Sequence, residues 1–181
     1  MSARNKWLVG VLGVVVLGVL GVVGYYWFMY PQGYHPACGQ ALKLALIFYA
    51  QEHDGQYPAG EATPEASLSL LWPKYADAQI LAGKTKSGKV AERILKSGGR
   101  LGPETCDWHY VEGLTEKDNG EIAIFWDKSN LDHTGRRRSD GAHEVFRIWS
   151  GKEYIPASRW GEFLAEQEKL LKEREEAKGK E

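Results

Sequence analysis

The sequence is poor in cysteine, and its first thirty residues contain no aspartate or glutamate. Only two of its 181 residues are cysteine, Cys38 and Cys106, which excludes a disulfide-rich scaffold and a four-cysteine zinc site. The five histidines lack the spacing of a metal-binding motif. The chain has 23 basic and 24 acidic residues, so its charge balance gives no indication of a nucleic-acid partner.

No charged residue interrupts the apolar run over residues 7–29. As a helix this run would be about 35 Å long, enough to cross a hydrocarbon core of about 30 Å with some tilt. We therefore expect residues 1–30 to form a short cytoplasmic stub and a transmembrane anchor. The alternatives are a cleavable signal peptide and a buried core helix. The length of the run and the lack of a small-residue cleavage site favour an uncleaved anchor.

The flanks of the run predict its orientation. Arg4 and Lys6 precede it, and the next cation is Lys43. The positive-inside rule therefore predicts an inner-membrane protein with a cytoplasmic N-terminus and a periplasmic C-terminal domain. Membrane lipid is the first expected partner. Aromatic residues at the two ends are expected to lie in the membrane interfaces, and these are Trp7, Tyr25, Tyr26, Trp27 and Tyr30.

Four glycines of the run fall on one helical face. At 100° per residue, Gly10, Gly13, Gly21 and Gly24 lie within an arc of roughly 80°. Small residues on one face let a second helix approach closely. We expect this stripe to pack against a helix of another membrane protein, although no strict GxxxG spacing is present.

The two cysteines both follow the anchor, where the expected compartment is oxidising. An even count in such a compartment predicts a Cys38–Cys106 disulfide, which would stabilise the fold by roughly 4 kcal/mol in the chain-entropy model. Two free thiols are the first alternative. The second is a metal site that uses the C-x-x-H spacing of Cys106 and His109.

The remaining residues predict an α+β fold. Residues 36–53 have the apolar periodicity of an amphipathic helix, which a turn at Asp54-Gly55 would end. Strand patterns over residues 108–112, 122–126, 145–149 and 152–155 are close in sequence, so we expect a small antiparallel sheet with the helix on one face. A periplasmic domain over residues 31–156 would precede an amphipathic-to-charged helix over 157–181, whose charged end we expect to project or fray.

No set of residues forms a convincing catalytic motif. The segment 82–104 is rich in glycine and lysine but lacks phosphate-loop spacing, so we expect an exposed loop with one helical turn at residues 90–95. Arg136–Arg138 is either a solvated turn or a contact for an anion or a lipid head group. Accordingly, no enzyme activity, cofactor or small-molecule substrate is expected. A metal-dependent periplasmic enzyme is the less favoured alternative, with Asp132, His133, Asp140 and His143 as its candidate ligands.

Several short motifs, taken in order, resemble a known family. They are Cys38, then LKLALIFYAQEHDGQYP (residues 42–58), LSLLWPKY (68–75), Cys106, HYVEGLT (109–115), IAIFWDK (122–128) and VFRIWSGKEYI (145–155). This order is similar to pseudopilin-like proteins of the type II secretion and type IV pilus superfamily, and closest to the prepilin-type group found in planctomycetes. The resemblance covers roughly residues 37–156 and implies a pilin-like domain with membrane or periplasmic protein partners.

The chain departs from that family at its N-terminus. It has no prepilin peptidase site, and Pro31 and Pro36 interrupt the path from the apolar run to the next helix. We therefore expect a pilin-like domain on a permanent tether, acting as a structural or interaction component of an envelope assembly. The alternative is an accessory single-pass subunit of another membrane complex.

Overall fold

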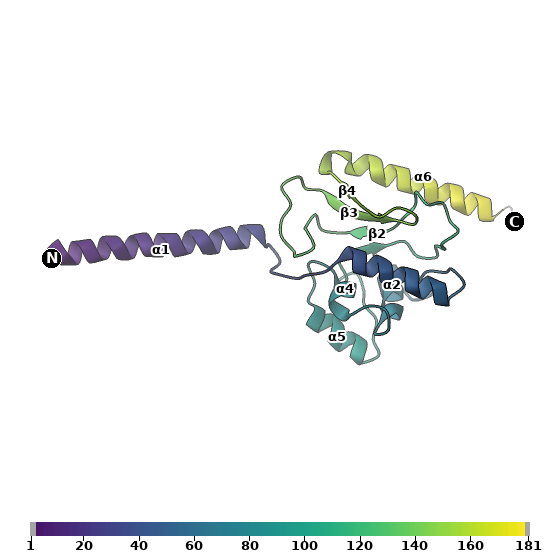
Figure 1. Ribbon diagram of the computed structural model, residues 1–181, viewed down its shortest axis with the longest axis horizontal. Coiled ribbons are helices and arrows are strands. Elements are labelled where there is room, and N and C mark those ends of the chain that lie inside the picture. The colour runs from purple at the N-terminus through teal and green to yellow at the C-terminus, as the bar shows by residue number, and fades with distance from the viewer. Residues whose placement is uncertain (1–2, 180–181) are drawn as a thin grey trace.

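A computed structural model describes residues 3–179 of the chain. Met1 and Ser2, where the predicted cytoplasmic stub begins, lie outside the described residues. Helix α1 (Ala3–Met29) extends away from the rest of the chain as a single rod (Figure 1). It contains one stretch, Gly10–Met29, that is long and apolar enough to cross a membrane.

Helix α2 (Gly39–Glu52) is separated from α1 by a non-helical linker. It begins three residues later than the sequence predicts, and it ends as predicted, because Asp54 and Gly55 take positive φ values of 54° and 79°. Leu42 and Leu46 on its inner face are fully buried. The amphipathic helix expected from the periodicity is therefore confirmed.

The glycine- and lysine-rich segment is more ordered than predicted. It follows α3 (Pro64–Leu68), a 3-10 turn (Ser69–Leu71) and α4 (Ala78–Ala82), and it contains the nine-residue helix α5 (Gly88–Lys96). Ala91 and Leu95 of α5 are buried one helical turn apart. The expectation of an exposed loop with one helical turn was wrong, because the few apolar residues among the lysines and glycines share one face.

Four strands form an antiparallel sheet in the order β1-β2-β3-β4. They are β1 (Trp108–Tyr110), β2 (Ala123–Asp127), β3 (His143–Arg147) and β4 (Lys152–Ile155). The predicted meander is confirmed, with boundaries shifted by up to two residues. The β2–β3 register shifts between Ala123 and Phe125, so Ile124 and Phe125 both belong to the core on the α2 side.

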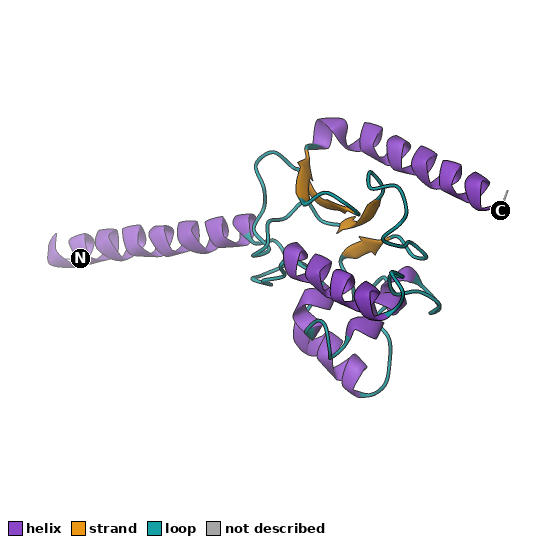
Figure 2. Cartoon of the chain, turned by 45° about the vertical axis from the view of Figure 1, so that its right-hand side comes forward, coloured by secondary structure: helices purple, strands orange, loops and turns teal. Residues whose placement is uncertain are grey.

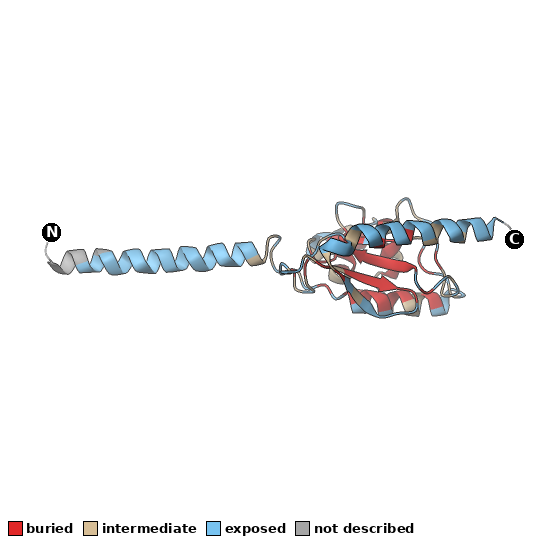
Figure 3. Ribbon diagram, turned by 90° about the horizontal axis from the view of Figure 1, so that it is seen from above, coloured by how far each residue is buried: buried red, intermediate tan, exposed pale blue. Residues whose placement is uncertain are grey.

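Helices cover both faces of this sheet, as Figures 1 and 2 show. Helix α2 and the short helices α4 and α5 lie on one face, where Leu42 and Phe146 join the larger core. Helix α6 (Trp160–Lys178) lies on the other, where Phe163 packs with Trp126 and Val145. Buried strands lie between these layers (Figure 3), and every residue of β2 is buried, whereas the edge strand β4 is largely exposed. The prediction of one covered face was therefore incomplete.

The charged end of α6 is docked along the domain. Arg174 donates to Asp118 with an Nε–Oδ1 distance of 2.6 Å and also reaches the Gly113 carbonyl. Its side chain is only 10% exposed, and the helix continues to Lys178. The expectation that this end projects or frays was wrong, because one arginine anchors a stretch that has almost nothing apolar to bury.

Candidate functional site

The predicted disulfide is absent, and both cysteines are free thiols. Cys38 is exposed at the N-cap of α2, whereas Cys106 is buried with its sulfur 3.2 Å from the Leu81 carbonyl oxygen. The two thiols therefore occupy different environments, one at the surface and one behind α4. Burial raises the pKa of Cys106 to about 12, which leaves it an inert, small apolar side chain.

The residues predicted to contact lipid or a second helix are displayed along α1. Trp7, Tyr25 and Trp27 are each more than 60% exposed. The remaining interface residues form a ladder, in which the Tyr26 and Tyr30 rings stack with centroids 5.0 Å apart and Tyr34 follows at 6.3 Å. Open space surrounds every glycine of the predicted stripe, which comprises Gly10, Gly13, Gly21 and Gly24.

The end of α1 is held by a loop that lies more than a hundred residues further along the chain. We call residues 131–138 the junction loop. The Arg137 backbone N–H donates to the Met29 carbonyl at 2.7 Å, and Arg137 Nε donates to the Phe28 carbonyl at 3.3 Å. The guanidinium also lies 5.2 Å from the centre of the Phe28 ring. Arg137 thus supplies partners for carbonyls that the last turn of a helix leaves unpaired.

The junction loop also binds the linker between α1 and α2. The N–H groups of His35 and Ala37 donate to the carbonyls of Thr134 and His133, at 3.3 and 2.9 Å. Gly135 has a φ of 85°, and a Cβ there would stand 2.9 Å from the Gly33 carbonyl oxygen. Glycine at this position therefore permits both the turn and the close approach to the linker.

The loop is shaped by its own acidic and basic side chains. Asp132 Oδ1 accepts bonds from the backbone N–H groups of Thr134 and Arg136 at 2.8 and 3.0 Å. Although burial would raise the pKa of Asp132, these donors and the Thr134 hydroxyl outweigh it and lower the pKa. Arg138 is paired with Asp140 at 2.8 Å and lies 4.0 Å from the centre of the Tyr154 ring.

A buried ionic network fixes the base of the junction loop. The Lys84 ammonium is fully buried and lies 2.6 Å from Asp127 Oδ2, 2.8 Å from Glu144 Oε2 and 2.8 Å from the Leu131 carbonyl oxygen. Lys84 therefore joins β2 and β3 to the first residue of the loop. Burial alone would lower the pKa of Lys84, but the two carboxylates outweigh it and raise the pKa.

Two further positive groups lie near Glu144, the second carboxylate of this network. Glu144 Oε2 lies at the N-terminus of α2, where a Cβ on Gly39 would stand 3.3 Å from it, so the positive end of the helix dipole faces the charge. Lys152 Nζ lies 3.8 Å from Glu144 Oε1. Lys84, Asp127 and Glu144 are buried from solvent, and their pairing holds the surrounding elements together.

The candidate metal ligands between residues 132 and 143 do not converge. Asp132 and Asp140 bond within their own turns, and His133 is exposed. His143 faces the other way, with Nδ1 2.9 Å from Asp127 Oδ1 and its ring stacked on Trp160 at 3.9 Å. Within residues 3–179, no three His, Cys, Asp or Glu side chains come together as a metal site.

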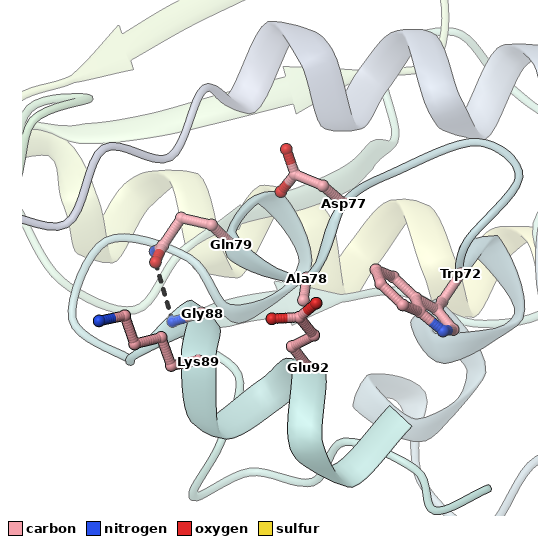
Figure 4. Close-up of a pocket in the computed structure, with 7 residues that line it drawn as sticks. All are labelled: Trp72, Asp77, Ala78, Gln79, Gly88, Lys89 and Glu92. Atoms are coloured by element: carbon pink, nitrogen blue, oxygen red, sulfur yellow. Dashed lines mark hydrogen bonds between the residues drawn. The ribbon is translucent and has the colours of Figure 1, made fainter. Parts of the chain in front are cut away.

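Gln79 lines a pocket between α4 and α5 (Figure 4). Gln79 Oε1 accepts from the Gly88 N–H at 2.8 Å, while its amide nitrogen donates to the carbonyls of Gly83 and Lys86. Asp77 in the same wall accepts from the Ile80 N–H and so caps α4. Gln79 therefore holds the segment before α5, and the hydrogen-bond partners of both Gln79 and Asp77 are backbone groups.

No protein-family model, curated protein sequence or solved structure matches this chain. Many residues of the motifs on which the family resemblance rests lie in the core. Leu42, Leu68 and Leu71 are fully buried, and the Tyr57 hydroxyl has its pKa raised to about 12 by burial and by the nearby charges of Glu116 and Asp118. The motifs thus account for packing. The cluster of Lys84, Asp127 and Glu144 was not predicted, since nothing in a glycine-rich sequence segment marks its lysine as buried.

Proposed function

We propose that this chain is a single-pass, membrane-anchored periplasmic protein with a structural or interaction role. It would be a pseudopilin-like component of an envelope assembly and not an enzyme. The observation that carries the proposal is the exposed apolar surface of α1 joined through its last turn to a folded domain. A helix that is apolar all round is suited to lipid, and the core of this domain is complete without it.

The side of the membrane on which the domain lies is inferred from the charged residues that flank the apolar segment. Arg4 and Lys6 precede the apolar segment, whereas the next cation, Lys43, belongs to the folded domain. This asymmetry favours a cytoplasmic N-terminus and a periplasmic domain. Retention of Met1 to Lys6 on the mature chain, measured as an intact mass, supports an anchor. A mature N-terminus after Val23 contradicts it.

The arrangement of the domain supports an interaction role. The charged side chains of Lys84, Asp127 and Glu144 form ion pairs with one another inside the domain. The pilin-like part of the proposal rests on the sequence motifs and on a helix packed against an antiparallel meander. The non-helical linker from Tyr30 to Cys38 favours a permanent tether over a continuous filament-forming helix.

The alternative is an accessory subunit of another membrane complex, docked through α1. The open glycine stripe and the aromatic ladder at the end of α1 favour it. In lipid, close packing between helices has to supply the association energy. Leucine at a stripe glycine would fill the space that a neighbouring helix needs.

Recovery of crosslinked partners from native membranes tests the proposal. Gly13→Leu and Gly21→Leu lie on the stripe, and Gly18→Leu, about 100° from its centre, is the matched control. Partners lost only with the stripe variants indicate docking through α1, and partners held by all three indicate docking through the periplasmic domain. A chain that crosslinks to no membrane or periplasmic protein contradicts the interaction role.

A further inference from the structure

We propose that Arg136 and Arg137 bind the phosphate of an anionic phospholipid in the leaflet that faces the domain. This inference rests on the proposed function, because it requires α1 to be inserted in a bilayer. It adds to that function a specific lipid contact, made by the folded domain and independent of the apolar surface of α1.

The depth of the site follows from the bonds that Arg137 makes. Phe28 and Met29 are the last residues of the membrane-spanning stretch, and Arg137 bonds both of their carbonyls. Tyr25, Tyr26 and Trp27, one turn earlier, suit the level of the lipid head groups. A guanidinium fixed at this point of the helix therefore lies among phosphates as soon as α1 spans the membrane.

Arg137 uses its Nε to bond the Phe28 carbonyl, and its two terminal guanidinium nitrogens and the Arg136 guanidinium are available to bind an anion. Arg138 is already neutralised by Asp140, and all three hydrogen bonds that Asp132 Oδ1 accepts are internal to its turn. Arg136 and Arg137 are exposed, and within residues 3–179 neither forms an ion pair with a carboxylate. They line one depression at the end of α1 with Met29, Ser139, Arg138 and the two internally bonded carboxylates, Asp132 and Asp140. A guanidinium matches a phosphate through parallel N–H donors.

The loop that carries the site is held by contacts within the protein that need no lipid. A bridge between Leu131 and Arg137 closes the loop, and Lys84 holds the Leu131 carbonyl from inside the domain. Gly135 lies against the linker. A preorganised loop loses little conformational freedom on binding, so each charge contributes more fully to affinity.

Native mass spectrometry of the full chain tests the inference. The protein is reconstituted in bilayers of phosphatidylcholine with and without phosphatidylglycerol, and the lipids that stay bound on release are counted. We expect preferential retention of phosphatidylglycerol. We also expect Arg136→Gln and Arg137→Gln each to reduce the preference about five-fold, the equivalent of about 1 kcal/mol for a cation at an anionic surface.

Control experiments distinguish a lipid phosphate from free phosphate, and failure of the lipid site from failure of the membrane anchor. Lys89→Gln with Arg93→Gln removes two exposed charges from α5 and should leave the preference unchanged. Added inorganic phosphate should not displace the lipid, and if it does, the site binds free phosphate instead. An unchanged preference in the Arg136→Gln/Arg137→Gln double variant overturns the lipid site alone. A parent chain that fails to stay with the bilayer overturns the anchor as well.

Discussion

The two long helices at the ends of the chain have opposite relations to the domain. Helix α1 is the most apolar element, yet Val14 and Leu17 near its middle are at least 70% exposed. Helix α6 is rich in charge, yet it buries Phe163 and Gln167 against the sheet. The comparison teaches that the apolar surface of α1 does not serve the packing of this chain, whereas a few well-placed residues are enough to dock α6.

The helices also differ in how they are attached. Helix α6 is held along its length, by Phe163 in the core, by Gln167 Oε1 accepting from the Ala123 N–H at 2.8 Å, and by Arg174 near its end. Helix α1 is held at its last turn, where Arg137 of the junction loop bonds the carbonyls of Phe28 and Met29. Changes in the domain should therefore affect α6 through packing and α1 through the position of that loop.

The largest effect is expected at the base of the junction loop. Lys84→Met leaves Asp127 and Glu144 as buried carboxylates without their shared cation, and should lower the unfolding free energy by about 3–5 kcal/mol. Denaturant unfolding of the full chain in detergent, followed by tryptophan fluorescence, measures this. The Arg137 amide should also lose protection from hydrogen exchange, because the loop is no longer held through Leu131.

A charge-balanced variant sharpens this prediction. Combining Lys84→Met with Asp127→Asn and Glu144→Gln removes the uncompensated charges and should recover a large part of the lost stability. Parent-like stability of the single Lys84→Met variant would show that the network does not hold the domain together.

The next effect is expected in the apolar contact of α6. Phe163→Ala removes a buried ring that packs against Trp126 and should cost about 3 kcal/mol. Its neighbour Leu164 is 39% exposed, so Leu164→Ala is a matched control with an expected cost of about 1 kcal/mol or less. Equal costs for the two variants would contradict the packing of α6 on the sheet.

A smaller effect is expected at the charged end of α6. Arg174→Gln breaks the pair with Asp118 and should cost about 1.5–3 kcal/mol. Burial would raise the pKa of Asp118, but Arg174 outweighs it and lowers the pKa in the fold. The stabilisation is thus complete above the unfolded pKa of about 3.9 and is lost as the pH falls through the lower folded value.

The pH dependence of the Arg174→Gln variant checks this assignment. The difference in unfolding free energy from the parent should be constant between neutral pH and about pH 5, and should shrink below about pH 4. A difference that stays constant through acid would mean that Arg174 acts only through the Gly113 carbonyl.

The smallest effect on the domain is expected from α1. Leu17→Arg should leave the unfolding free energy of the domain unchanged, because the side chain is 70% exposed. The same change should disfavour membrane insertion by about 2.5–3.5 kcal/mol, seen as protein lost from the membrane fraction. A destabilised domain would show that α1 packs against it.

Most of the fold could be predicted from local patterns. The apolar run marked α1, the periodicity around Leu42 and Leu46 marked α2, and the closely spaced strand patterns gave the meander. Contacts between segments far apart in sequence leave no local pattern and could not be predicted. Lys84 lies in a segment whose composition suggests exposure, and the bond from Arg137 to Met29 joins residues more than a hundred positions apart.

The prediction of a disulfide was wrong for a related reason. Their even number and expected compartment pointed to a bond, but pairing depends on where the fold places each thiol. Cys38 faces solvent at the start of α2, and Cys106 faces the core. Composition carries no information about that placement.

The most direct test of the account uses the exposed thiol of Cys38, which lies just beyond the end of α1. A membrane-impermeant maleimide added to intact spheroplasts should label Cys38, while Cys106 should react only after unfolding. The labelled chain should sediment with the membranes and keep its N-terminal residues. Labelling of Cys38 only after the membrane is lysed, or a labelled chain released into the soluble fraction, would contradict a periplasmic domain on a membrane anchor.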